Sequence, residues 1–473
     1  MMRNAFRKLT LVPMIGASTL VVGFVSTAHV QAAEAYGLQA IYQKAVSFDA
    51  KLAQAKAEFE SESQASSTAM GALLPQIQAE GNYFITDSNN DLVDNHSQSL
   101  SLTLNQSIYQ HDQWARFHQA QYVVEAAQYR YQLAQQDLIL RVSEAYFDVL
   151  LAQKNLSLAK DKYDADLTQF DTANAAFELG LASQVDVQEA KSNLDLSKAD
   201  IISAENQLDI TFETLANISG MQVTVLKNEG LKALLADVAL PSEAFQIHNI
   251  LREVEVQNLS VKVATTQLNQ ATEEVAVKRS GHLPSISFQA QYTDQEYSEF
   301  QAGSTFTDSE MRSESRPFSI YAGSTFTDSE TTRYGINVTM PLFSGGSVNS
   351  EVTAAKKQTL SAQEALRDAK QSATLEARTL IRSIEQGHKL IAALREAVKS
   401  NNAFVKSAQE GFKVGMRSML EVLTAISNQT SAQRDLTEAI HNQVLNRLRL
   451  EATLGVLDVD DIAKYEPLLQ VEN

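Results

Sequence analysis

The sequence predicts a mainly α-helical fold with a membrane β-barrel portion, in which long coiled-coil helices alternate with four β-strands per chain. Three observations lead to this prediction. A long segment of the 473-residue chain lacks Gly and Pro, four short segments alternate apolar and polar residues, and the second half repeats the first. The first two patterns are typical of long helices and of membrane strands, and the third indicates an internal tandem duplication.

The longest predicted helix runs from Asp112 to Leu179, a stretch of 68 residues without Gly or Pro. As one continuous helix it would extend about 100 Å, at ~1.5 Å per residue. Its apolar residues recur at alternating spacings of four and three, the pattern of a coiled-coil seam. The seam positions are Leu138, Val142, Ala145, Val149, Ala152, Leu156, Ala159 and Tyr163. This segment is therefore predicted to be a long packed helix.

The two halves of the chain match each other in order. The segment from Phe177 to Ala190 matches that from Phe412 to Ala425 at an offset of 235 residues, and Leu74-Pro75 upstream matches Leu283-Pro284. We therefore divide the chain into residues 33–240 and 241–457, each with the order helix, two strands, long helix, helix. Residues 458–473 form a C-terminal segment.

Four segments show the alternation of apolar and polar residues that predicts strands with one apolar and one polar face. They are residues 75–87, 99–108, 286–292 and 334–342, the last with Met340 and Leu342 on its apolar face. Such strands suit a membrane barrel with a wet interior, although an ordinary hairpin on a soluble core remains an alternative. Four strands cannot close a barrel, so several chains would have to contribute.

Residues 1–32 have the pattern of a signal peptide. Arg3, Arg7 and Lys8 precede an apolar run, and Val30-Gln31-Ala32 fits a cleavage site before Ala33, with an uncleaved anchor as the alternative. Removal of these residues leaves 36 Lys and Arg against 57 Asp and Glu. This negative balance argues against nucleic-acid binding. The sequence therefore predicts an exported chain that is periplasmic, secreted, or inserted in the outer membrane through its strands.

No motif predicts catalysis or a cofactor. The chain has no cysteine, which excludes a disulfide framework, a thiolate metal site and a lipidated N-terminal cysteine. Histidine pairs with zinc-protease spacing, nucleophile elbows and phosphate-binding loops are also missing. We therefore expect no enzyme activity, no metal and no cofactor.

A loop between the third and fourth predicted strands contains a tandem repeat. The nine residues Ala302–Glu310 recur as Ala322–Glu330. Growth of this kind is tolerated in a surface loop because lengthening it costs little closure entropy. The loop either recognises something at the cell surface or has simply drifted, and the sequence leaves both interpretations open.

The order of these elements resembles the TolC family of outer-membrane efflux proteins, from about Tyr36 to Leu457. The most telling motifs are Pro341-Leu-Phe-Ser-Gly-Gly346, which leads from strand into helix, and the turn Val414-Gly415-Met416-Arg417-Ser418. The resemblance implies a homotrimer with one twelve-stranded barrel and a periplasmic helical tunnel, in which about residues 220–242 and the C-terminal residues 457–473 form a belt partway along the tunnel. It also implies an inner-membrane pump, of RND, ABC or MFS type, and a periplasmic adaptor protein as partners. The chain is then expected in the outer membrane, where it contacts lipid, and in the periplasm.

The same resemblance assigns roles at the end of the tunnel. Gly180, Leu181 and Ser183 in one turn, and Gly415, Met416 and Ser418 in the other, would dock the adaptor. Arg417 and Asp186 match residues that hold the tunnel shut, whereas Phe412 replaces a tyrosine and so lacks its hydroxyl. Glu421 matches an acidic ring at the entrance, where three carboxylates would favour cations. The alternative is that Glu421 merely faces solvent.

The resemblance implies a passive trimeric duct of tripartite efflux pumps and type I secretion systems. Such a duct would export drugs, small toxic molecules and proteins, and would contribute to multidrug resistance. The alternative is a periplasmic or secreted coiled-coil scaffold protein, which the helices alone would permit. The four strands at matching positions of the repeat favour the channel.

Overall fold

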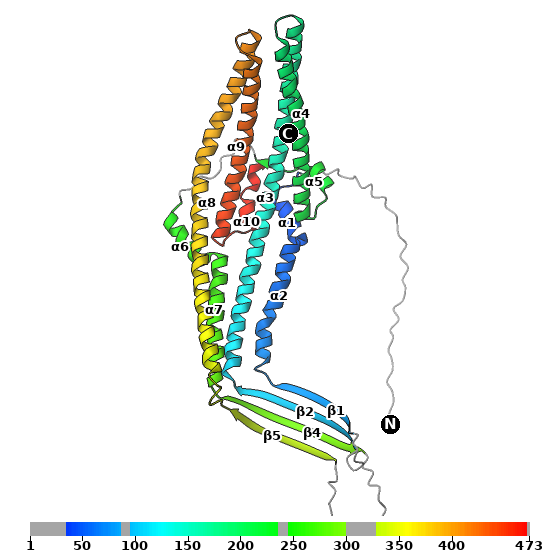
Figure 1. Cartoon of the computed structure of the whole chain (residues 1–473), viewed down its shortest axis with the longest axis vertical. Coiled ribbons are helices and arrows are strands. Elements are labelled where there is room, and N and C mark those ends of the chain that lie inside the picture. The colour runs from blue at the N-terminus through cyan, green and yellow to red at the C-terminus, as the bar shows by residue number, and fades with distance from the viewer. Residues whose placement is uncertain (1–34, 87–94, 235–244, 299–327, 471–473) are drawn as a thin grey trace, which may run out of the picture.

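The chain is an elongated bundle of long helices with a four-stranded sheet at one end (Figure 1). The computed structural model describes residues 35–86, 95–234, 245–298 and 328–470. The predicted signal peptide and nearly all of the duplicated loop lie outside these residues. Within the described ranges, none of the helices is long and apolar enough to cross a membrane.

The elements of the first half follow the predicted order, except that its first helix is divided in two. They are α1 (Leu38–Phe48), α2 (Ala50–Gly71), β1 (Gln76–Thr86), β2 (Asn95–Tyr109), α3 (His111–Glu178), α4 (Gln184–Ser219), α5 (Val223–Glu229) and β3 (Ala233–Leu234). The prediction of a long helix after the first two strands is confirmed by α3, which contains 68 residues.

The second half repeats this order, again with a divided first helix. Its elements are α6 (Ile247–Gln257), α7 (Leu259–Arg279), η1 (Ser280–His282), β4 (Ser285–Ser298), β5 (Ser329–Thr339), α8 (Ser347–Lys413), α9 (Met419–Thr453), α10 (Val459–Ala463), η2 (Glu466–Leu468) and β6 (Leu469–Gln470). The prediction that the last long strand continues through Met340 and Leu342 is wrong, because β5 ends at Thr339. Pro341 has no N–H to donate to a neighbouring strand, which explains the end of β5 at this point.

Sheet and helices share one lateral order. The long strands form an antiparallel sheet in the order β1-β2-β4-β5, so β1 and β5 are its edges. Next to the sheet, α2 packs on α3, α3 on α7 and α7 on α8, while farther away α4 packs on α3, α3 on α9 and α9 on α8. Each layer of the protomer thus has one edge at β1, α2 and α4 and the other at β5 and α8.

The coiled-coil seam predicted in α3 is buried over its first part. Leu138, Val142 and Val149 are fully buried, whereas Leu156 and Tyr163 are only partly buried. Farther along α3 the buried positions are Leu158, Asp166, Gln169 and Ala173. The buried stripe therefore changes its register along the helix, which a fixed heptad extrapolated from the sequence does not capture.

The main core lies midway along the helices, where α1, α3, α4, α5, α9 and α10 meet. At its centre the fully buried Tyr146 shares its single hydroxyl proton between the carbonyl oxygens of Lys232, at 2.5 Å, and Tyr36, at 3.1 Å. Beside it, β3 pairs with β6, which ties the end of the first half to the C-terminal segment. Whether these segments form a belt around an assembled tunnel stays a prediction.

The divided first helices are each capped by an Asx residue at equivalent positions of the repeat. Asp49, between α1 and α2, accepts a hydrogen bond from Leu52 N at 2.8 Å, and Asn258, between α6 and α7, accepts one from Val261 N at 3.1 Å. Such caps satisfy amide groups that a helix start leaves unpaired. Each break is therefore a capped joint between two separate helices, whereas the sequence predicted a single helix.

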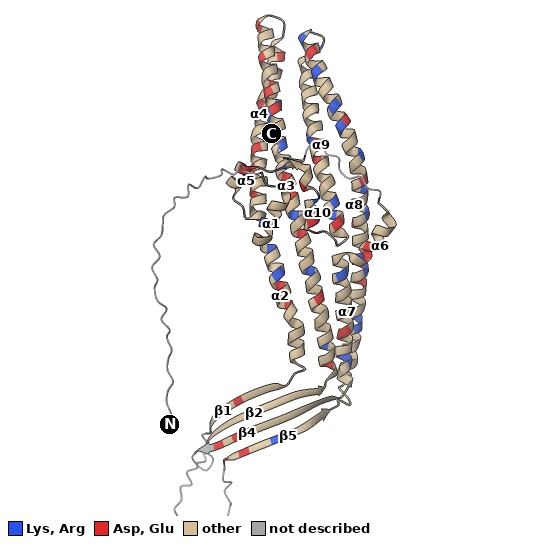
Figure 2. Cartoon of the chain, turned by 180° about the vertical axis from the view of Figure 1, so that it is seen from behind, with Lys and Arg blue, Asp and Glu red and all other residues tan. Residues whose placement is uncertain are grey.

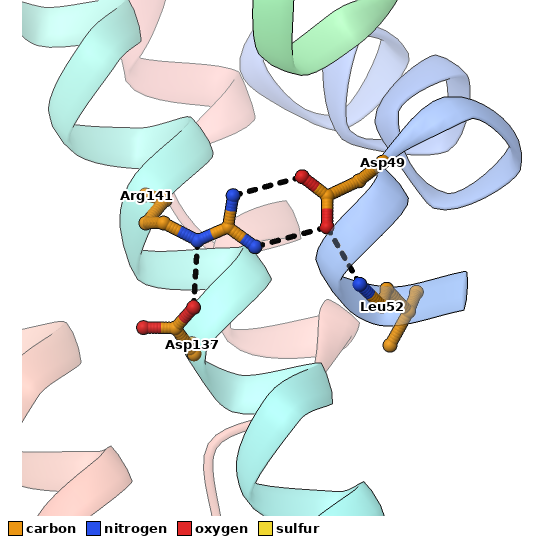
Figure 3. Close-up of polar contacts among 4 residues, drawn as sticks. All are labelled: Asp49, Leu52, Asp137 and Arg141. Carbon is orange, nitrogen blue, oxygen red and sulfur yellow. Dashed lines mark hydrogen bonds and ion pairs between the residues drawn. The ribbon is translucent and has the colours of Figure 1, made fainter. Parts of the chain in front are cut away.

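The first joint is fixed by charge, as Figure 3 shows. Arg141 of α3 donates two hydrogen bonds to the carboxylate of Asp49, at 2.8 and 3.0 Å, and a third to Asp137 at 2.6 Å. Asp49 is only 7 % exposed. The hydrogen bonds from Arg141 hold the pKa of Asp49 below its usual value, despite the opposing effect of burial.

The second joint is fixed by a neutral contact. Asn258 donates its side-chain amide to the carbonyl oxygen of Thr453 at 2.8 Å, at the end of α9. Gly455 follows with φ 75°, and a Cβ there would collide with the carbonyl of Gln257. At the equivalent position of the first half, a Cβ on Gly220 would collide with the ring of Phe48. In each half, the helix that returns from the tip therefore ends against a joint. Helix α4 ends against the joint between α1 and α2, and α9 ends against the joint between α6 and α7.

Candidate gate at the helical tip

Each long helix reverses at the end of the bundle opposite the sheet through the same five-residue turn (Figure 1). In the turn Leu179–Ser183, Gly180 has φ 74°, and Leu181 N donates to Ala176 O at 2.8 Å. The second turn has the same pattern around Gly415, whose φ is 73°. These bonds are the Schellman pattern, which needs the left-handed conformation that glycine adopts without strain.

The helix that leaves each tip begins with a reciprocal cap. In the first tip Asp186 N donates to the hydroxyl of Ser183 at 3.2 Å, while Ser183 N donates to the carboxylate of Asp186 at 2.8 Å. Ser418 and Glu421 form the same capping box in the second tip. The backbone hydrogen bond from the serine is the largest cause that lowers the pKa of each carboxyl group. Both acidic residues therefore have a structural role in addition to the one predicted from the resemblance.

Arg417 forms an ion pair with Glu421 within its own turn, at 2.9 Å, and both side chains are about half exposed. Asp186 lies in the other tip and is bonded to Ser183. The single chain thus brings together Arg417 and Glu421, two residues to which the resemblance gives separate roles. A link between Arg417 and Asp186 requires a rearrangement or another copy of the chain, and it stays a prediction.

The stem of Arg417 lies across Gly411 of α8. A Cβ added at Gly411 would approach Cγ of Arg417 to 2.6 Å, closer than packed atoms allow. The equivalent positions of the first half are Ala176 and Ala182, where no long side chain follows the turn. Gly411 was not predicted as a site residue. The only signal in the sequence is that a glycine and an arginine replace two alanines between the repeats.

Phe412 packs between the two tip hairpins. It is half-buried and contacts apolar clusters that include residues of all four tip helices. The cluster shared by the hairpins contains Ala173, Val187, Ala190, Met419 and Leu423. Phe412 therefore joins the hairpins by apolar contact, as its lack of a hydroxyl group suggests.

The turns themselves expose apolar side chains. Leu181 is 80 % exposed and Met416 is 78 % exposed, at equivalent positions of the two tips. Leu179 and Val414, beside the glycines, are also exposed. Exposed apolar residues gathered at one end of a molecule are typical of a contact surface, so the geometry agrees with the predicted docking turns without testing them.

These features define a class of protein. A four-stranded sheet lies at one end, long helices extend from it, and two turns followed by capping boxes lie at the other. This architecture is that of a duct which connects a membrane to a site far from it. The chain belongs to the outer membrane efflux protein family, whose sequence signature matches residues 41–221 and 250–456.

Individual relatives agree with this assignment. The chain is 28 % identical over 437 residues to the outer membrane protein TolC of Vibrio cholerae, an alignment that covers 92 % of this chain and 94 % of that protein. It is 24 % identical over 451 residues to the proteases secretion protein PrtF of Dickeya chrysanthemi, which covers 93 % and 92 %.

Solved structures share the fold. The outer membrane protein VceC of Vibrio cholerae superposes with a TM-score of 0.71 at 15 % identity, over 88 % of this chain and 96 % of that one. The CmeC outer membrane channel of Campylobacter jejuni superposes with a TM-score of 0.72 at 17 % identity, over 91 % and 89 %. The chain is an outer membrane efflux channel that extends into the periplasm, a transport protein and not an enzyme. The coiled-coil scaffold alternative is therefore set aside.

Proposed function

We propose that three copies of the chain form one passive channel, with a twelve-stranded barrel in the outer membrane and a helical tunnel in the periplasm. The observation that carries this proposal is the open sheet. Among the residues that the structure describes, the edge strands β1 and β5 lack a neighbour on one side, and every residue of β5 is exposed. Unpaired strand edges cannot remain open in lipid, because no water is present to satisfy their backbone groups.

The charges of the two edge helices support a ring in which each copy contacts the next head to tail. Helix α4, at one edge, carries seven acidic and two basic residues, whereas α8, at the other edge, carries eleven basic and seven acidic residues. Figure 2 shows the acidic residues along α4 and the basic residues along α8. A ring joins unlike edges, so each interface would bring an acidic helix against a basic one.

The channel would carry what a partner pump delivers. The relatives' names include efflux and protease secretion, so drugs, small toxic molecules and secreted proteins are the proposed cargo. An inner-membrane pump of the resistance-nodulation-division (RND), ATP-binding-cassette (ABC) or major-facilitator (MFS) type, and a periplasmic adaptor protein, are the proposed partners. The adaptor would dock at the exposed turns around Leu181 and Met416.

The gate would lie where the tips converge. Arg417 and Asp186 would link neighbouring hairpins in the closed state, with Phe412 packed behind them. The Arg417–Glu421 pair would hold the guanidinium near the entrance, where Glu421 also contributes to an acidic ring. Because an exposed ion pair contributes only ~0–1 kcal/mol, the gate would depend on several copies acting at one constriction.

Oligomeric size and channel activity test the proposal together. We expect the purified protein to be a trimer in detergent and to form pores in planar bilayers. We also expect Arg417→Ser to raise single-channel conductance with little change in the thermal unfolding midpoint. A monomer without channel activity would disprove the channel proposal, whereas a trimeric channel with unchanged Arg417→Ser conductance would disprove only the gate assignment.

A further inference from the structure

One face of the four-stranded sheet is polar and almost free of charge. The Cα pairing places Glu80, Ser101, Thr293 and Thr331 on this face at one level of the sheet. Wherever the side chains of the strands are described, the uncharged residues on this face are Ser, Thr, Asn, Gln and Gly, together with Phe84. The opposite face carries Ile77, Leu104, Ala290 and Tyr334 at one level. The polar face therefore suits the wet interior of a barrel and the apolar face suits lipid.

Two charged residues break the neutrality of the polar face, and they have opposite signs. They are Glu80 of β1 and Arg333 of β5. Arg333 shares this face with Gln291, its partner in β4. Both charged side chains are exposed, and Arg333 has no ion-pair partner among the described residues. The two charges therefore lie on the two open edges of the sheet, on the same face.

In the part of the sheet that the structure describes, charged residues on the polar face are confined to the two edge strands, β1 and β5. The inner strands β2 and β4 carry no charged residue on the polar face within the described side chains. Inside one chain, two intervening strands separate Glu80 from Arg333. At a spacing of about 4.8 Å per strand, they are too far apart for direct contact. Only another copy brings the two residues together.

The alternation of faces restricts how β5 of one copy can pair with β1 of the next. A shift of one residue would turn the polar face of one strand toward the apolar face of the other, so the allowed registers differ by two residues. Full overlap of the two strands places Glu80 opposite Gly335 and Arg333 opposite Asn82. A shift by one allowed step places Glu80 directly opposite Arg333.

Both registers leave the two charges within reach of each other. Residues directly opposite have Cβ atoms about 4.5–5.5 Å apart, and diagonal neighbours are roughly 7–8 Å apart, which long side chains span. We propose that Glu80 of each copy forms an ion pair with Arg333 of the next copy across every seam of the barrel. This inference rests on the proposed trimer and adds what the trimer alone does not specify, the pair of residues that fixes the register of the seam.

Such a pair would have two consequences. Opposite charges at the seam favour the registers that bring them together and disfavour contact between two identical edges, where like charges would meet. The pair would also leave the barrel interior without net charge over the described strands. The ionic contribution to selectivity would then come from the helical tip and not from the barrel.

Charge reversal tests the pair through the heat stability of the trimer on gels of unboiled and progressively heated samples. We expect Glu80→Lys and Arg333→Glu each to lower the temperature at which the trimer dissociates, because each puts like charges at every seam. The double variant should recover at least half of the loss. Asn105→Lys, which adds a charge on the same face of the inner strand β2, is the matched control. It should not be rescued by Arg333→Glu, because two strand spacings separate β2 from β5.

A second measurement uses the absence of cysteine from the natural chain. We expect the double variant Glu80→Cys, Arg333→Cys to be linked between copies by a short bifunctional thiol reagent. Ala79→Cys with Arg333→Cys is the control, because Ala79 neighbours Glu80 but lies on the opposite face. This variant should give little linked product.

The outcomes separate the ion pair from the trimer itself. A trimeric wild type without rescue and without cross-linking at positions 80 and 333 would overturn the proposed pair and leave the channel proposal in place. A wild type that never forms a trimer would overturn both. Rescue together with face-specific cross-linking would support both the pair and the head-to-tail order of the copies.

Discussion

The two joints between the helix pieces differ in chemistry although they occupy equivalent positions of the repeat. The first is held by the buried carboxylate of Asp49 and the guanidinium of Arg141, and the second by the neutral amide of Asn258 and a backbone carbonyl. Both keep the Asx cap of the following helix. Capping is a local requirement of the backbone, so it is common to both halves, whereas the contact to the rest of the bundle differs.

The same distinction holds at the tips. Both have a Schellman turn and a capping box, but only the second has an arginine and the glycine that accommodates it. In a duplicated chain, the parts that satisfy the backbone are therefore retained in both halves, whereas the side chains that contact other elements can differ. The second half carries the predicted gate arginine, while the first carries the charged joint.

A buried histidine gives the largest expected difference between the halves. His441 of α9 is 6 % exposed, and the centre of its ring lies 5.1 Å from the centre of the Phe147 ring. Its Nδ1 atom has no hydrogen-bond partner among the described residues. Burial lowers its pKa from 6.5 to about 4. The equivalent residue of the first half is Asn206, which does not titrate.

Because the folded state favours neutral His441, the unfolded state binds the proton more readily. The stabilisation is therefore complete above about pH 6.5 and is lost as the pH falls toward 4, by about 3 kcal/mol. We expect the thermal unfolding midpoint, followed by helical circular dichroism, to fall over this range. His441→Gln should remove that part of the pH dependence, and equal slopes for the two proteins would contradict the prediction.

The joint formed by Asp49 and Arg141 gives the next largest expected change in stability. Arg141→Met leaves the carboxylate of Asp49 buried without its cation, and we expect this to cost about 2–3 kcal/mol. The double variant Asp49→Asn, Arg141→Met copies the neutral joint of the second half and should recover most of the loss, because Asn also caps a helix. Thermal unfolding at pH 7 measures both. A double variant no more stable than Arg141→Met would show that the charge is not the cause.

Long-range organisation was predictable where local signals repeat. The absence of Gly and Pro predicted α3, the turn glycines Gly180 and Gly415 predicted both tips, and alternation predicted the strands. The joints were missed, because an Asx cap inside a continuous helical pattern looks like any polar surface residue. Asp49 and Asn258 become recognisable only when the two halves are aligned and both positions prove to be caps.

The partners of the site residues were harder to predict than the residues themselves. The sequence singled out Arg417, Asp186 and Glu421, but it did not show that Arg417 contacts Glu421. The spacing Ser-x-x-Asp and Ser-x-x-Glu is a capping-box signature. The resemblance nevertheless assigned Asp186 to the gate and Glu421 to an acidic ring, and neither residue was predicted to be a helix cap. Side-chain partners depend on the helix direction after the turn, which a motif alone does not specify.

The capping boxes of the two tips give a smaller expected effect on stability. Ser183→Ala and Ser418→Ala each remove one reciprocal cap, and we expect each to cost about 1 kcal/mol. Because the first tip has no arginine pair, Ser183→Ala should act on helix α4 alone, whereas Ser418→Ala also loosens Glu421, the partner of Arg417. Amide hydrogen exchange in the first turns of α4 and α9 measures the loss. Unchanged protection in both would contradict the capping role.

The smallest expected change in stability concerns Gly411, where the two tips differ most directly. Gly411→Ala places a Cβ 2.6 Å from Cγ of Arg417, so the arginine side chain must move away from its position beside Glu421. Alanine favours a helix by roughly 0.5–1 kcal/mol over glycine, which offsets the lost contact and leaves the unfolding midpoint nearly unchanged. If Arg417 holds the gate, the conductance of Gly411→Ala should nevertheless rise as in Arg417→Ser.

The matched control for Gly411→Ala is Ala176→Gly, at the equivalent position of the first tip. No long side chain crosses that position, because residue 182 is alanine. We expect Ala176→Gly to lower stability by the helix propensity alone and to leave conductance at the wild-type level. A rise in conductance in both variants would mean that the flexibility of the tip, and not the position of the Arg417 side chain, controls the conductance of the channel. No rise in either would remove Gly411 from the gate, because a displaced arginine would then have no effect on ion flow.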